Sequence, residues 1–70
     1  MKIKLSELRK RSFIEKVMLH CHDQSLYLVS VILDSEERYV TDDKGDFLKS
    51  FNKLSLQAKF KGLVIGKMVL

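Results

Sequence analysis

The chain has no proline and no tryptophan, one cysteine and three glycines among its 70 residues. A single cysteine cannot form an internal disulfide, whereas small secreted domains usually need several, so we expect a reducing, cytoplasmic environment. No signal-peptide apolar segment follows the basic N-terminus. The longest uncharged apolar-rich stretch, residues 24–33, is far shorter than the roughly 20 residues of a membrane-spanning helix. The sequence therefore predicts no membrane contact.

The chain also lacks linkers, low-complexity segments and internal repeats, which predicts a single domain over residues 1–70. A chain this short buries only about 60% of the surface that it exposes when unfolded, so its core is thin. A subunit interface would supplement the small free energy of unfolding of such a domain.

Acidic residues are absent from the last third of the chain. Residues 1–16 carry a net charge of +4, residues 17–46 carry −5, and residues 47–70 carry five lysines and no acid. This layout predicts either basic ends packed beside an acidic middle, or separate positive and negative faces.

Strand patterns occupy the middle of the chain. From Glu15 the apolar period is two, with Cys21 on the apolar face and both histidines on the other. Residues 26–33 are rich in Val, Ile and Tyr with both faces apolar, which is typical of a central strand. Polar turns are predicted at residues 22–25 and 34–37.

The stretch "TDDKGDFL" predicts a hairpin, with Gly45 in the left-handed conformation after a type I turn. Its arms are residues 38–41 and 47–49. The final stretch, "LVIGKMVL" at residues 63–70, predicts a last strand. Its apolar end suggests a buried strand, a subunit contact or a chain that ends early.

Two helices are predicted. The first is short, with Ser6 as N-cap and Arg11 near its end, and it turns Leu5 and Leu8 inward. The second candidate, residues 51–61, fits both a strand and a helix template. We favour a helix because the segment lacks β-branched residues, Ser50 precedes it as a possible N-cap, and Gly62 follows it.

The second helix has apolar side chains on two sides. Phe51, Leu54 and Ala58 share the side that we expect to face the core, and Leu56 and Phe60 fall on the opposite side. Either the helix is covered twice, or the second pair meets a partner subunit. Together the elements predict an α+β fold: a small, mainly antiparallel sheet of four to five strands, a short N-terminal helix and one helix before the last strand.

The segments "LYLVSVIL", "RYVTDDKGDFLKSF" and "LSLQAKF" with a closing strand resemble a family of short single-domain bacterial proteins known only as a domain of unknown function. The resemblance covers most of the chain. It implies a compact α+β fold and a bacterial cytoplasmic protein, and it supplies no activity and no catalytic residues.

His20 and His22 lie two apart on a strand, so they point to one face at a separation that suits a shared metal ion. Two ligands do not complete a site, and we interpret the histidines as half-exposed strand residues, with a zinc or nickel site as the weaker alternative. Cys21 lies on the apolar face without an activating charge, which predicts a buried structural thiol.

No motif indicates catalysis or a cofactor. The stretch "DDKGD" lacks the ligand pattern of a calcium-binding loop, and the three glycines are too scattered to cradle a phosphate. We therefore expect neither enzymatic activity nor a bound cofactor.

Nucleic acid is the one specific partner class that the composition favours. Aromatic residues that could stack on bases are Tyr27, Tyr39 and Phe51. The candidate contact residues in the C-terminal basic block are Lys49, Lys53, Lys59, Lys61 and Lys67. On a helix, however, three of these lysines point in different directions, and scattered lysines usually keep a surface soluble.

The leading hypothesis is a non-catalytic protein that acts through protein contacts, with an unknown protein partner, and that forms a homodimer. It rests on the large amount of apolar surface in so short a chain. The alternative is a nucleic-acid-binding module that uses the basic N- and C-terminal blocks.

Overall fold

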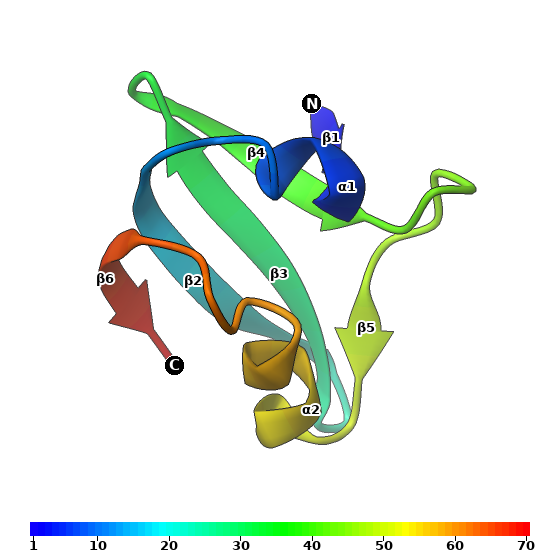
Figure 1. Ribbon diagram of the computed structural model, residues 1–70. Coiled ribbons are helices and arrows are strands. Elements are labelled where there is room, and N and C mark those ends of the chain that lie inside the picture. The colour runs from blue at the N-terminus through cyan, green and yellow to red at the C-terminus, as the bar shows by residue number, and fades with distance from the viewer.

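The computed structural model describes all 70 residues and consists of one mixed sheet and two short helices (Figure 1). The elements are β1 Lys2–Lys4, α1 Leu5–Leu8, β2 Ile14–Asp23, β3 Leu26–Leu33, β4 Glu36–Thr41, β5 Lys49–Ser50, α2 Lys53–Ala58 and β6 Ile65–Val69. The α+β prediction is confirmed, although the sheet has six strands and not four to five. Neither helix is both long and apolar enough to cross a bilayer.

The strand order is β1-β4-β3-β2-β6, and the short β5 pairs with β3. The pairings of β3 with β2, β4 and β5 are antiparallel. The outer strands β1 and β6 instead pair in parallel with β4 and β2. The mainly antiparallel prediction therefore holds for the centre and is wrong at both edges. Two parallel strands are joined by a long crossover and not by a hairpin, so no turn signal in the sequence predicts their pairing.

Two tight turns join β2, β3 and β4 into a meander. Gln24 and Ser25 have φ of 41° and 71°, and Asp34 and Ser35 have φ of 52° and 68°. Positive φ at both central residues is characteristic of type I′ turns, whose twist matches that of the strands they connect. Both polar turns are thus confirmed, and β3 is the central strand, as predicted.

The hairpin turn after β4 is also confirmed. Gly45 has φ of 90°, and Thr41 and Phe47 form a bridge across the turn. One carboxylate oxygen of Asp42 accepts hydrogen bonds from the backbone N–H groups of Lys44 and Asp46, at 2.9 and 3.0 Å. This side chain closes the turn from within.

The core lies on one face of the sheet. Leu8 from α1 and Leu56 from α2 belong to the same buried cluster as Val29 and Val31 from β3. Figure 1 shows both helices on that side. Because side chains alternate along a strand, the neighbours of these valines on β3 project to the opposite face, which no helix covers. We call this second surface the open face.

The helices differ from their predicted bounds. α1 begins at Leu5, and its N-cap residue is Lys4, which forms no side-chain cap bond; Ser6 lies inside the helix. Leu8 is buried and Leu5 packs against the core, as predicted. α2 is capped not by Ser50 but by Asn52, whose side-chain oxygen accepts a hydrogen bond from the Leu54 N–H at 2.8 Å.

The predicted inward side of α2 is wrong. Leu56 and Phe60 are buried, whereas Phe51 and Leu54 are 72% and 70% exposed, and Ala58 is exposed too. The physical reason is the helix start: α2 begins at Lys53, so Phe51 precedes the helix and cannot share a stripe with Leu54. Without Phe51 that stripe keeps Leu54 as its only large apolar side chain, together with Ala58. Leu56 and Phe60, which follows the helix four residues later, bury two large side chains in the core.

We expect Leu56→Ala to lower the free energy of unfolding by about 2–5 kcal/mol, because it leaves a cavity in the core. The matched control Leu54→Ala removes the same atoms from an exposed position and should change it by less than about 0.5 kcal/mol. Urea denaturation followed by circular dichroism measures both values. Equal losses for the two variants would contradict the observed orientation of α2.

Candidate functional site

The open face carries rows of side chains that the strand register brings together. One row joins Val69 of β6, Met18 of β2, Ser30 of β3, Tyr39 of β4 and Lys2 of β1. Directly paired residues project to the same side of a sheet. Because nothing packs over it from the rest of the chain, this face is the candidate functional site.

Rows on either side follow the same rule. The row before it holds Lys67, Lys16, Ile32 and Glu37. The row after it holds His20, Leu28 and Lys49, and at the hairpin end Lys4 pairs with Thr41, which in turn pairs with Phe47. A lysine stands at an end of every row.

A hydrogen-bonded chain of three side chains crosses the centre of the open face. His20 Nε2 lies 2.6 Å from Ser30 Oγ, which donates to Glu37 Oε2 at 2.8 Å. His20 Nε2 is also 3.5 Å from Glu37 Oε2. A carboxylate can only accept, so the single Ser30 hydroxyl proton points to Glu37 and the imidazole must donate to the hydroxyl oxygen. The bonds therefore fix His20 with a proton on Nε2.

This chain of bonds differs from that of a nucleophilic serine. In a Ser-His-acid triad the imidazole lies between the hydroxyl and the carboxylate and accepts the hydroxyl proton. Here the hydroxyl lies between the imidazole and the carboxylate, and it donates its hydrogen bond to the carboxylate. Ser30 is also fully buried, so its oxygen cannot reach a substrate. The geometry holds the three side chains in place and does not generate a nucleophile.

Aromatic rings extend the chain toward the hairpin. The ring centroids of His20 and Tyr39 are 5.6 Å apart, and those of Tyr39 and Phe47 are 5.8 Å apart in an edge-on arrangement. Lys2 Nζ lies 4.6 Å from the centroid of the Phe47 ring. These contacts are in the range of favourable aromatic and cation–π interactions, so they restrain the rings on the sheet surface.

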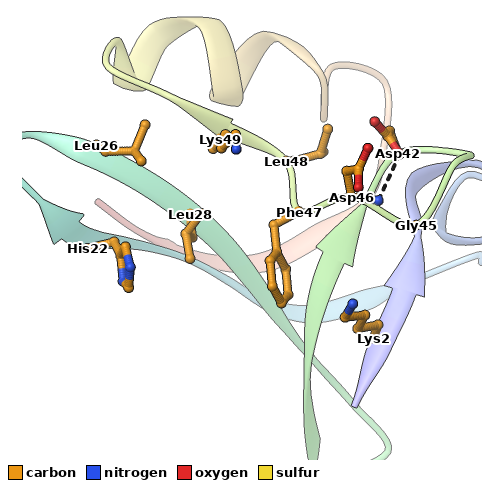
Figure 2. A pocket seen from close by; sticks show the side chains of 10 residues that line it. All are labelled: Lys2, His22, Leu26, Leu28, Asp42, Gly45, Asp46, Phe47, Leu48 and Lys49. Carbon is orange, nitrogen blue, oxygen red and sulfur yellow. Dashed lines mark hydrogen bonds between the residues drawn. The ribbon is translucent and has the colours of Figure 1, made fainter.

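A shallow hollow opens beside Phe47. Figure 2 shows Phe47, Leu28 and His22 on the side of the sheet away from the yellow helix α2, whereas Leu48 points toward that helix. Lys2 and Lys49 stand at its margin with two carboxylates. The lining residues are Lys2, His22, Leu26, Leu28, Asp42, Gly45, Asp46, Phe47, Leu48 and Lys49. The hollow thus continues the open face with an apolar floor and a charged margin.

The structure does not bring the two histidines together around a shared ligand position. His20 is engaged by Ser30 and Glu37, whereas His22 lines the hollow. No group of three His, Cys, Asp or Glu side chains lies close enough to hold one metal ion.

The prediction of a buried Cys21 is wrong, because its thiol is exposed. Cys21 pairs with Tyr27 at the far end of β2, beyond the last buried residue of that strand, Leu19. The register also shifts between Cys21 and Asp23. The alternation of apolar residues along β2 continues to Cys21, but the buried core ends at Leu19.

The five candidate lysines separate into two groups. Lys49 and Lys67 belong to rows of the open face. Lys53 lies over the Tyr27 ring, with Nζ 5.0 Å from the centroid, and Lys59 and Lys61 follow α2 on the other side of the sheet. Sequence reasoning did not group Lys2 and Phe47 with Lys49, which the structure brings together at the hollow. The two turns determine the register of β2, β3 and β4, but no sequence signal near β1 indicates that it pairs with β4.

A family model provides the one comparison that matches. The model of a family of unknown function, DUF6482, matches residues 1–70, the whole chain. The chain belongs to this family. The resemblance to a family of short single-domain proteins of unknown function is thereby confirmed. Neither the curated proteins nor the solved structures include a significant match to this DUF6482 member.

The His20 tautomer gives a direct check on the polar chain. We expect nitrogen-15 correlation spectra of the neutral imidazole to show a protonated Nε2 and an unprotonated Nδ1. In Ser30→Ala the acceptor is lost, and the preference should weaken. His22, which no such chain holds, is the internal control. A protonated Nδ1 at His20 in the unmodified protein would contradict the bond directions.

Cys21 should react with a thiol reagent in the folded protein at a rate near that of a free cysteine, because its sulfur is exposed. The reaction with Ellman's reagent, with and without urea, measures the difference. Protection that disappears only on unfolding would mean that the thiol is buried.

Proposed function

We propose that this protein is a non-catalytic, cytoplasmic binding module that forms a homodimer through the outer edge of β6. The observation that carries the proposal is an edge strand with exposed apolar neighbours. β6 pairs with β2 on one side only, so backbone groups on its other side have no strand partner. Of the alternatives for the apolar C-terminal stretch, a buried strand is wrong, because β6 is an edge strand without a buried residue, and a subunit contact remains a proposal.

Apolar side chains surround this edge. Val64, Val69 and Phe13 are all exposed. The Phe13 ring lies beside Gly66, where an added Cβ would come within 3.0 Å of it, and the Ile14 N–H donates to Val64 O at 2.9 Å. Phe13 and Val64 thus lie near the start of β6, and Val69 lies at its end. We call these three residues the apolar margin. An exposed apolar edge strand is a template for pairing with another chain.

The opposite edge of the sheet has the features of a protected edge. β1 contains three residues, Lys2, Ile3 and Lys4, and its two lysines are exposed. Short, lysine-bearing edge strands oppose pairing. In β6 one residue of five is charged, Lys67, whereas two of the three residues of β1 are lysines.

A second copy is the occupant that fits this edge best. Two β6 strands in antiparallel contact about a two-fold axis would present the same apolar margin to each other, and such an interface is self-complementary. A dimer would also supplement the thin core of a 70-residue chain. The non-catalytic part of the proposal is supported by the polar chain on the open face, in which Ser30 is buried and its hydroxyl donates a hydrogen bond to Glu37.

We expect sedimentation equilibrium at high micromolar concentration to give twice the mass of one chain. Val69→Lys should raise the dissociation constant at least tenfold, which corresponds to about 1.4 kcal/mol, because it places a charge on the apolar margin. Leu54→Lys is the matched control, since Leu54 is exposed on α2, and it should leave the mass unchanged.

A monomer at the highest concentration would refute the dimer. A dimer that responds to Leu54→Lys and not to Val69→Lys would move the interface from β6 to α2.

A further inference from the structure

We infer that the open face is a binding site for single-stranded nucleic acid. The inference does not depend on the dimer, because it concerns the surface of the sheet and not its edge. It also differs from the lysine set suggested by the C-terminal basic block, since only Lys49 and Lys67 of that set lie on this face.

The first observation is the charge of the open face. Five lysines belong to its rows, and they stand on four different strands. They are Lys2, Lys4, Lys16, Lys49 and Lys67. The one carboxylate within those rows, Glu37, accepts a hydrogen bond from Ser30 and lies beside His20. Asp42 and Asp46 stand only at the margin of the hollow. The face is therefore complementary to a polyanion.

The second observation is the pair of aromatic side chains, Tyr39 and Phe47, that lies among these lysines. Phe47 is 40% exposed and Tyr39 is half-buried beside it, and both rings are restrained by their neighbours. Rigid rings on an open sheet can stack on unpaired bases with little loss of conformational entropy, and comparable sheets stack two or three bases. A duplex hides its base faces and could use only the lysines.

The size of the face agrees with a short single strand. Five neighbouring strands at about 4.8 Å spacing span roughly 19 Å. The polar chain adds rigidity, because His20 is held by Ser30 on one side and packs 5.6 Å from Tyr39 on the other. The ligand class is thus a segment of a few nucleotides whose phosphates meet the lysines and whose bases meet Tyr39 and Phe47.

The test is fluorescence polarisation with labelled oligothymidine and oligouridine, and with a duplex of equal length, across a salt series. We expect the single strands to bind, with log affinity falling against log salt by about 0.7 for each phosphate contact. The duplex should bind at least tenfold more weakly.

Matched charge variants locate the surface. Lys2→Gln, Lys16→Gln and Lys49→Gln together remove three charges from the open face without changing a residue of β6, and we expect affinity to fall about tenfold or more. The control changes Lys10, Lys59 and Lys61 to Gln, which removes three charges from exposed positions in the α1 and α2 segments. This control should lose less than about threefold.

Phe47→Leu separates stacking from charge. It keeps an apolar side chain against Tyr39 but removes the ring, and we expect a loss of about tenfold for single strands and no change for the duplex. Thermal denaturation verifies that each variant folds, and sedimentation equilibrium verifies that its oligomeric state is unchanged.

Four results would overturn the inference: no binding at low salt, equal loss in the two triple variants, equal affinity for duplex and single strand, or binding to phosphatidylglycerol vesicles alone. A protein that dimerises through β6 but binds no oligonucleotide would refute this inference and leave the proposed function intact. Oligonucleotide binding by a protein that stays monomeric would support this inference and refute the proposed dimer.

Discussion

Burial of one face of the sheet is the interaction on which the rest of the structure depends. Leu8, Leu56 and Phe60 cover the valines of β3, and twelve apolar side chains form the resulting cluster. With two helical segments this short, the chain can cover only one side of its sheet. The other side must be stable in water, and its two buried polar side chains are hydrogen-bonded: Ser30 donates to Glu37 and Thr41 donates to the Asp42 carbonyl. The surface available for binding is thus a consequence of the small core.

Local signals predicted the elements well, and long-range pairings poorly. The β3 segment, the two polar turns and Gly45 were predictable because each depends on residues adjacent in sequence. The strand β1 was not predicted, because three residues are too few to show a strand period. It forms through its parallel pairing with β4, which lies far away in the sequence. The inward side of α2 was missed because two apolar stripes fit the sequence and the helix start decides between them.

The candidate site shows the same division. Tyr39 and Lys49 were recognised as potential contact residues from their chemistry alone. Their grouping with Lys2 and Phe47 requires the β1–β4 pairing and the bridge from Thr41 to Phe47, which join segments far apart or separated by a turn. The error at Cys21 has a related cause, since alternation continues along β2 after the helices have ceased to cover it.

The two parallel edge strands have a consequence for the order of folding. β2, β3 and β4 are joined by two-residue turns, so their contacts close short loops, whereas β1 and β6 come from opposite ends of the chain and close long ones. Closing longer loops costs more entropy. The meander should therefore form first, with both edges added late and lost early. Amide protons of β6 would then exchange through local fraying, well before the global unfolding that exposes those of β3.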